Sequence, residues 1–299
     1  MRLEYKTDTD GVILTRLYGD SPVVSVPSVI ADRPVIGLGE YCFSEKGSSD
    51  TPDGAICIDH EGAEERSLSG DYIIEVSIPE TVRSIGDLCF YGCRKLKTVE
   101  LYDASIGSDA FMNCHQLSLF IIHKSVCEKT ALRRILMQRN AETYVRFEDA
   151  EAYFPEFTEH YDLIGPAHIF ELAIDGEGLR ARQCFEDEVF KPEAYDAAFQ
   201  RAVSAEDERT LCRMAAARLQ FPEHLSEEAR NMYEDHISEH IEVLAADAIL
   251  NRDLSLIISL AERGELSSEQ IKKCLTMTTK ERWIEGTRML LGVSTSYNN

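Results

Sequence analysis

The sequence lacks any apolar run long enough to cross a membrane, and its start, MRLEYKTDTDG, has no apolar core such as a secretory signal peptide requires. We therefore expect no membrane insertion and a cytoplasmic location. Basic residues are also scarce, since 31 Lys and Arg accompany 53 Asp and Glu and the formal net charge is −22. Such a surface repels phosphate groups, so we expect no nucleic-acid partner and a protein partner that is neutral or basic.

Motifs of the common enzyme classes are missing as well. The sequence contains no phosphate-binding loop of the form G-x-x-x-x-G-K-[ST] and no G-x-S-x-G nucleophile motif. The nine cysteines are scattered, without the paired C-x-x-C spacing of a structural zinc site. These absences predict a protein that is not an enzyme and binds no cofactor. They leave open what Cys89 and Cys93 do in the stretch CFYGC, where a metal site, a redox pair and core packing are all conceivable.

What the sequence does have is an internal repeat with a period of 21 residues. A less regular copy precedes it, in which Cys42 and Phe43 correspond to Cys89 and Phe90, and a Gly/Ser/Asp-rich insertion follows that copy. Repetition at a fixed short period is the signature of stacked repeat architectures. The residues that recur in the two regular copies are Ile85, Gly86, Phe90, Cys93 and Leu96, followed by Ile106, Gly107, Phe111, Cys114 and Leu117.

Each copy predicts one short strand and one helical turn. The stretches IIEVSI, LKTVEL and LSLFII share an L-x-x-L-x-L pattern, whose last two apolar positions alternate as on a strand with one buried face. The glycine after Ile85 suits a tight bend, and Phe90 and Cys93 would face inward from the helical turn. One such unit cannot bury its own apolar face, so neighbouring units must stack. Packing is therefore the favoured role of Cys93 and Cys114.

These residues resemble the BspA-like class of leucine-rich repeats, whose unit is approximately v-x-I-P-x-x-V-x-x-I-G-x-x-A-F-x-x-C-x-x-L. Ile78 and Pro79 match the start of that unit, and the resemblance covers roughly residues 10–125. It implies a curved β-solenoid, and members of the family are mostly adhesins, host-interaction proteins or uncharacterised. A secreted or surface adhesin whose leader is missing from this sequence is therefore one alternative for the function.

The leading functional hypothesis is a non-catalytic protein-interaction or scaffold protein that uses the repeat surface. Solenoids present extended surfaces, and the positions that alternate with the buried strand residues point outward. By position alone, Ser77, Lys97 and Glu100 are the predicted contact residues.

The rest of the chain changes character twice. Residues 125–140 have helical spacing and are expected to cap the open end of the solenoid. The acidic residues 148–194 then predict a connector with a β-hairpin that turns at Asp175–Gly178. From residue 195 the pattern is helical, with Asp and Ser at the expected helix starts and Gly264 and Gly292 at expected ends.

The predicted fold is therefore α+β, with a leucine-rich-repeat β-solenoid at residues 1–147, a small β connector at 148–194 and an all-α module of helical hairpins at 195–299. Within that module, HISEH fits the H-x-x-E-H pattern of inverted zinc peptidases. His236 and His240 would be the metal ligands and Glu239 the base of a metal-dependent hydrolase. A third ligand is not evident, so two histidines on an acidic helix are the favoured interpretation.

Overall fold

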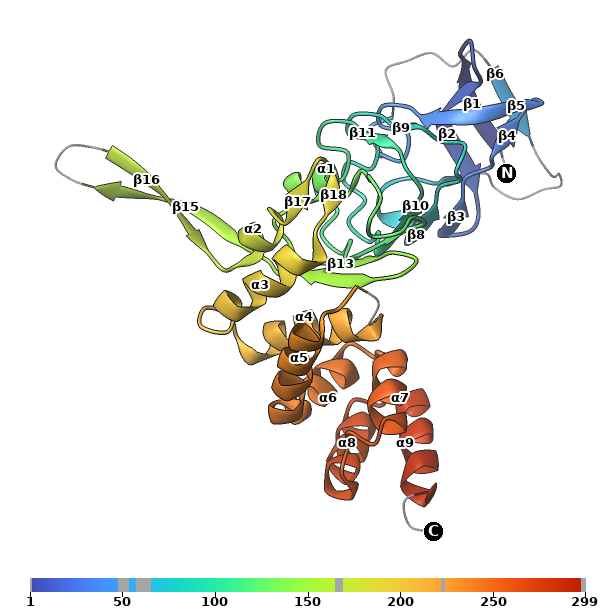
Figure 1. Ribbon diagram of the computed structural model, residues 1–299. Helices are drawn as coiled ribbons and strands as arrows, with labels where there is room; N and C mark the ends of the chain where they lie inside the picture. Colours follow the sequence, from blue (N-terminus) through green and yellow to red (C-terminus); the bar gives the residue numbers. More distant parts are fainter. Residues whose placement is uncertain (1, 48–53, 58–65, 165–168, 222–223, 297–299) are drawn as a thin grey trace. The chain divides into compact units, whose positions relative to one another are not determined.

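The chain forms two compact units, residues 1–198 and 199–299 (Figure 1). The first contains the stacked strands and the second is helical, so the predicted combination of a β-solenoid with an all-α module is confirmed. The finer boundaries at 147/148 and 194/195 stay predictions. The computed structural model describes residues 2–47, 54–57, 66–164, 169–221 and 224–296.

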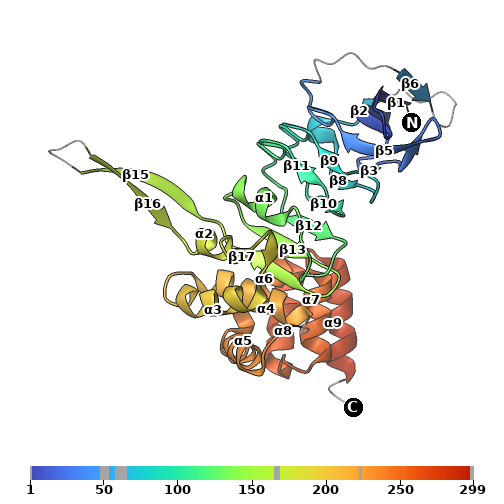
Figure 2. The same cartoon turned by 45° about the horizontal axis from the view of Figure 1, so that its top comes forward.

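One sheet of the first unit takes a single short strand from each turn of the solenoid, and Figure 2 shows these strands side by side. Its parallel strands are, in order, β3 (Val23–Ser25), β8 (Glu75–Ser77), β10 (Thr98–Leu101), β12 (Leu119–Ile122) and β13 (Thr143–Arg146), and β14 (Glu151–Phe154) adds an antiparallel edge. Their central residues are in register and at most 1% exposed: Val24, Val76, Val99, Phe120 and Val145. The side chains on either side of this buried row therefore point away from the core.

A second sheet forms where each turn runs back along another side of the solenoid. Its parallel strands are β5 (Arg33–Leu38), β9 (Ser84–Ile85) and β11 (Ser105–Ile106). Around β5 the sheet is extended by the N-terminal strands β1 (Arg2–Thr7), β2 (Val12–Gly19), β4 (Val29–Ile30), β6 (Gly54–Cys57) and β7 (Arg66–Ser67), and a 3-10 helix follows at Gly70–Tyr72.

The repeated glycines lie where successive turns of the backbone touch. A Cβ atom on Gly86 would come within 2.7 Å of the Glu40 backbone nitrogen, and one on Gly107 within 2.5 Å of the Asp87 backbone nitrogen. Neither glycine has a positive φ. These glycines are therefore not required for the tight bend expected from the sequence. They are required because only a residue without a side chain lets the backbone of one turn lie against that of the next.

The helical turns of the repeats build a ladder of aromatic rings. The rings of Phe43 and Phe90 stack with centroids 4.8 Å apart and 4° between their planes, and Phe90 stacks on Phe111 at 5.2 Å. All apolar repeat residues are at most 6% exposed: Ile78, Ile85, Phe90, Cys93, Leu96, Ile106, Phe111, Cys114 and Leu117. The core of the solenoid is therefore continuous from turn to turn.

The repeated cysteines cross-link the turns through hydrogen bonds. The Cys93 thiol donates to the carbonyl oxygen of Phe43 at 3.2 Å, and the Cys114 thiol donates to that of Phe90 at 3.1 Å. The hydrogen bond with Cys114 and burial hold the pKa of the Cys93 thiol well above its ordinary value. Cys93 is thus a neutral donor to the turn before it, whereas the hydrogen bond with Cys93 lowers the pKa of Cys114, and both cysteines are free.

The segment predicted to cap the solenoid has two roles. Helix α1 (Leu132–Met137) is followed by Gln138, whose side chain donates to the Gly107 carbonyl at 2.8 Å and accepts from the Ala110 backbone at 3.1 Å. These hydrogen bonds satisfy the Gly107 carbonyl and the Ala110 N–H, to which a further repeat would otherwise bond. The strand sheet nevertheless continues, because β12 pairs in parallel with β13 beyond the helix.

The connector contains a β-hairpin, but not the one expected at Asp175–Gly178. Strand β15 (Thr158–Ile164) pairs antiparallel with β16 (Ile169–Asp175), and residues 165–168 between them lie outside the described residues. The expected turn at Asp175–Gly178 is wrong, because α2 (Gly178–Ala181) begins there and a small hairpin of β17 (Phe185–Glu186) and β18 (Val189–Phe190) follows. Figures 1 and 2 both show the β15–β16 hairpin extending away from the solenoid.

The second unit consists of helices that pair in sequence order. From α4 onward most starts are capped by an Asp or Ser side chain, as expected: Asp207, Ser226, Asp253 and Ser267 each accept a hydrogen bond from a first-turn backbone N–H. Helix α3 (Pro192–Ala202) spans the boundary between the units, and the helices that follow are α4 (Glu208–Gln220), α5 (Glu227–Glu239), α6 (Ile241–Leu250), α7 (Leu254–Glu262), α8 (Ser268–Lys280) and α9 (Ile284–Ser296).

Two details of this unit differ from the sequence prediction. Gly264 follows α7 with φ of +71° and ends it as expected, but Gly292 lies inside α9 and ends nothing. His236 and His240, expected on one acidic helix, lie at the junction of two helices, because the chain leaves helical geometry at His240, with φ of −119°.

We expect Phe90→Ala to lower the free energy of unfolding of the first unit by about 3–5 kcal/mol, because it leaves a cavity between two stacked rings. Urea denaturation followed by circular dichroism measures this loss. Met112→Ala is the matched control, since Met112 belongs to the next turn but is 46% exposed. Equal stability of the two variants would contradict the ladder's role.

Candidate interaction surface

The outward face of the parallel sheet carries two rows of side chains that run across the turns. Strand register places Ser25, Ser77, Glu100, Ile121 and Arg146 in one row. The parallel row consists of Val23, Glu75, Thr98, Leu119 and Tyr144. Because the backbone of each strand is paired on both sides from β8 to β13, these side chains are held at the fixed spacing of neighbouring strands.

Glu100 is the centre of a polar cluster on this face. Its Oε1 lies 2.5 Å from Nε2 of His123, and Ser77 on the neighbouring strand also hydrogen-bonds its carboxylate. The His123 ring stacks on Tyr102 with centroids 4.7 Å apart. The hydrogen bond with His123, and then that with Ser77, lower the pKa of Glu100 below its ordinary value, although partial burial opposes them. The cluster therefore keeps a carboxylate oriented on a sheet face that mixes polar and apolar side chains.

The turns nearer the end of the sheet are more aromatic. Tyr144 packs against Tyr153 with ring centroids 4.7 Å apart, and the Arg146 guanidinium pairs with Glu151 at 2.8 Å. Leu119 and Ile121 are half-buried beside them. Tyrosine and arginine beside aliphatic side chains are typical of the centre of a protein interface.

The structure places the three predicted contact residues on this side of the solenoid in different settings. Ser77 and Glu100 pair across β8 and β10 and share a hydrogen bond. Lys97 is exposed and immediately precedes β10, so it lies at the margin of the sheet rather than within a row.

Sequence reasoning missed His123, Tyr102, Tyr144 and Arg146. Applying the 21-residue period to Glu100 points to Ile121, and the alternating stretch TYVR predicts a strand. A single sequence does not show that this strand pairs with β12. Nor does it show the contact between a histidine and a carboxylate one turn apart.

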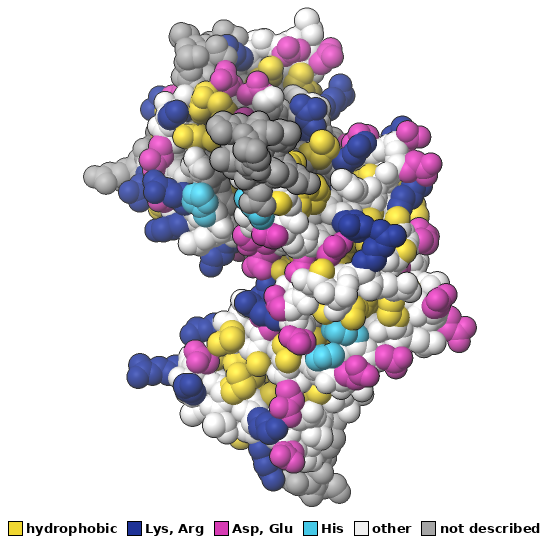
Figure 3. Space-filling view, turned by 90° about the vertical axis from the view of Figure 1, so that its left-hand side faces the viewer, with side chains coloured by type: hydrophobic (Ala, Val, Ile, Leu, Met, Phe, Trp, Pro, Cys, Tyr) yellow, Lys and Arg dark blue, Asp and Glu magenta, His cyan; other side chains and the backbone are white. Residues whose placement is uncertain are grey.

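Charges of both signs are mixed on one face of the molecule. Figure 3 shows, on one face of the molecule, Asp and Glu side chains interspersed with Lys and Arg. The net charge of −22 is therefore not gathered into a single acidic field on the face in view.

The candidate metal residues lie together and make local contacts, although Nε2 of His236 is buried without a hydrogen-bond partner among the described residues. The rings of His236 and His240 stack with centroids 4.5 Å apart, and the Phe199 ring lies edge-on to His236 at 5.5 Å. Nδ1 of His240 contacts the His236 carbonyl oxygen at 3.0 Å, and burial lowers the pKa of His236. Glu239 is exposed. Within the described parts of the chain, no group of three or more His, Cys, Asp or Glu side chains is arranged to hold a metal ion.

No helix in the described ranges is both long enough and apolar enough to cross a bilayer.

Comparison with known proteins identifies the repeats. Residues 64–132 match the family model described as "BspA type Leucine rich repeat region (6 copies)". This segment contains β8 to β12 and the two regular copies of the repeat, so residues 64–132 are BspA-type leucine-rich repeats. No curated protein matches the chain.

Two solved structures are similar over part of the chain. One is a leucine-rich-repeat protein of T. pallidum, with 23% identity over 41% of this chain and 51% of that one, at a TM-score of 0.28. The other is a leucine-rich cell surface protein of Faecalibacterium prausnitzii A2-165, with 22% identity over 39% of this chain and 27% of that one, at a TM-score of 0.29. The match spans about half the length of the first and about a quarter of the second.

The Glu100 cluster gives a pH prediction. An unfolded glutamate titrates near pH 4.3, and Glu100 in the folded chain titrates below that value. Its contribution to stability is therefore present above about pH 4.3 and is lost as the pH falls through the folded-state pKa. We expect His123→Gln to raise the pKa of Glu100, measured by carboxyl-carbon NMR.

Lys97→Gln is the control for that titration, because Lys97 is near Glu100 in sequence but makes none of these bonds. If both variants moved the pKa of Glu100 equally, the His123 contact would not be its main cause.

Proposed function

We propose that this protein is a non-enzymatic interaction or scaffold protein, and that its contact surface is the outward face of the sheet formed by β8, β10, β12 and β13. The single observation that carries the proposal is the pair of side-chain rows on that face. The rows combine half-buried apolar residues with an oriented carboxylate and an arginine, on a backbone fixed by the stacked turns beneath.

The BspA-type repeats support the same function. Repeat solenoids expose an extended surface whose outward positions do not contribute to the core. In this chain the inward positions are apolar and repetitive, whereas Ser77, Glu100 and Ile121 differ from turn to turn in the same row. A binding surface requires outward side chains that can vary while the buried repeat residues beneath them stay the same.

The partner would be a protein of neutral or basic charge. The chain has 22 more acidic than basic residues, so long-range attraction favours partners of opposite sign. Ser77 and Glu100 offer hydrogen-bond acceptors, and Ile121 and Tyr144 offer apolar area. Lys97 would contribute from the margin.

The two other functions that the sequence suggested receive less support. A metal-dependent hydrolase at His236 and His240 would need a further ligand, and the described residues supply none. A surface adhesin is a narrower form of the interaction function and stays a prediction.

We expect Ile121→Arg to weaken partner binding at least tenfold, about 1.4 kcal/mol, because it replaces apolar area at the centre of the surface by a charge. The full chain serves as bait for partner capture, and the affinity of the captured protein for each variant is then measured by titration calorimetry.

Met112→Arg is the matched control, since Met112 is exposed on the helical-turn side of the same solenoid. A partner that loses affinity for Met112→Arg but not for Ile121→Arg would place the binding surface elsewhere.

A further inference from the structure

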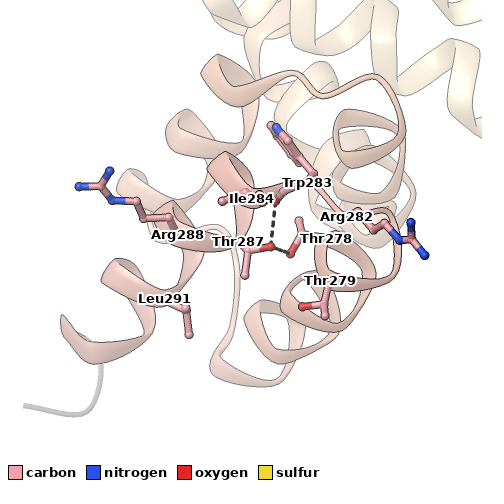
Figure 4. Close-up of a pocket in the computed structure, with 8 residues that line it drawn as sticks. All are labelled: Thr278, Thr279, Arg282, Trp283, Ile284, Thr287, Arg288 and Leu291. Atoms are coloured by element: carbon pink, nitrogen blue, oxygen red, sulfur yellow. Dashed lines mark hydrogen bonds between the residues drawn. The ribbon is translucent and has the colours of Figure 1, made fainter.

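A groove in the second unit lies between the C-terminal end of α8 and the first turns of α9. Its volume is about 430 Å³, and Figure 4 shows the side chains that line it. It is independent of the sheet surface proposed above, because all its lining residues come from residues 278–291.

The floor of the groove is apolar although it contains hydroxyl groups. Trp283 is 4% exposed and Thr278 is fully buried. Oγ1 of Thr287 lies 2.8 Å from the Trp283 carbonyl oxygen and 2.9 Å from Oγ1 of Thr278, and Thr279 donates to the Leu275 carbonyl. Since these hydroxyls are satisfied within the unit, the floor offers an occupant methyl groups and an indole edge rather than hydrogen bonds.

Gly286 makes this floor possible. A Cβ atom at this position would approach the indole ring of Trp283 to 2.3 Å. The missing side chain lets the indole lie flat against α9, so the groove depends on a close ring-to-backbone contact.

Helix α9 forms one wall of the groove, and its apolar side chains there are unusually exposed. Ile284 is 83% exposed, the largest value among the large hydrophobic residues of the described chain, and Leu291 is 53% exposed. They are separated by seven residues and Thr287 lies between them, so all three lie on one face of the helix. A helical face of this kind normally packs against another helix.

Two arginines flank the apolar groove. Figure 4 shows Arg282 and Arg288 extending to opposite sides of it. Both are exposed, and no salt bridge or side-chain hydrogen bond joins either guanidinium to a described residue. The groove is lined by two arginines and no acidic residue, although Glu281 and Glu285, adjacent in sequence, are exposed nearby.

We propose that this groove binds an amphipathic helix of a protein partner, with apolar residues on one face and acidic residues on both flanks. The apolar stripe would cover Ile284, Leu291 and the Trp283 floor, and the flanking carboxylates would pair with Arg282 and Arg288. A small carboxylate ligand fits less well, because one carboxylate cannot reach arginines on opposite sides.

A second copy of this chain is a poorer occupant. Helix α5 is the most acidic candidate, but its apolar residues Ala229, Tyr233 and Ile237 are already buried within its own unit. The preferred occupant therefore carries the charge opposite to that of the partner proposed for the sheet.

The single tryptophan makes the test specific, since Trp283 forms the floor of the groove and no other residue shares its emission. The full chain is titrated with a designed helical peptide of about 16 residues, which has leucines on one face and glutamates on both flanks. A second peptide replaces every glutamate by lysine. Trp283 fluorescence and titration calorimetry follow the binding.

We expect the acidic peptide to bind saturably, and at least about tenfold more tightly than the lysine peptide. The double variant Arg282→Glu with Arg288→Glu should reverse this preference, and Leu291→Ser should weaken binding of both peptides. Arg230→Glu, an exposed position on α5, is the matched control and should bind like the wild type. Circular dichroism verifies that each variant is folded.

Equal affinity for both peptides, or no saturable change in Trp283 emission, would overturn the proposal. So would a concentration-dependent dimer of the wild type that Leu291→Ser abolishes, because the occupant would then be a second copy. The variant Ile121→Arg should bind the acidic peptide normally, so failure here is distinguishable from failure of the proposed sheet surface.

Discussion

Contact between successive turns is the interaction on which the first unit depends. A 21-residue turn has too little apolar surface to fold alone, and its residues become buried only when the next turn lies on them. Phe43, Phe90 and Phe111 make that contact through stacked rings, and the thiols of Cys93 and Cys114 fasten each turn to the carbonyl of the one before. The sheet is parallel and in register because this inner ladder sets the spacing of the turns.

The same constraint separates the residues that fold the chain from those free to bind. Inward positions must match the turn above and below, and at Gly86 the backbone contact leaves no room even for a methyl group. Side chains at outward positions contact only solvent and their neighbours in the row. Glu100 and Ile121 can therefore differ in type without disturbing the core. In the second unit Gly286 has a comparable role, since it admits the Trp283 ring that becomes the floor of the groove.

The period of the sequence predicted which repeat residues are inward, because burial recurs with the turn and a stacked core tolerates few residue types. The period could not predict partners across turns. The His123–Glu100 contact joins residues of different turns, and the β15–β16 hairpin was misplaced because alternation marks a strand without naming its partner. Gly292 was expected to end a helix, but a glycine can be accommodated inside one at modest cost, and α9 continues through it.

A double-mutant cycle between Phe43 and Phe90 tests the central claim most directly, because it isolates the contact between two turns from the burial of each ring. The free energy of unfolding is measured for the wild type, Phe43→Leu, Phe90→Leu and the double variant. Stacking of these rings predicts a coupling energy of about 0.5–1.5 kcal/mol. Strictly additive losses would contradict the account, because the rings would then contribute to the core without holding one turn to the next.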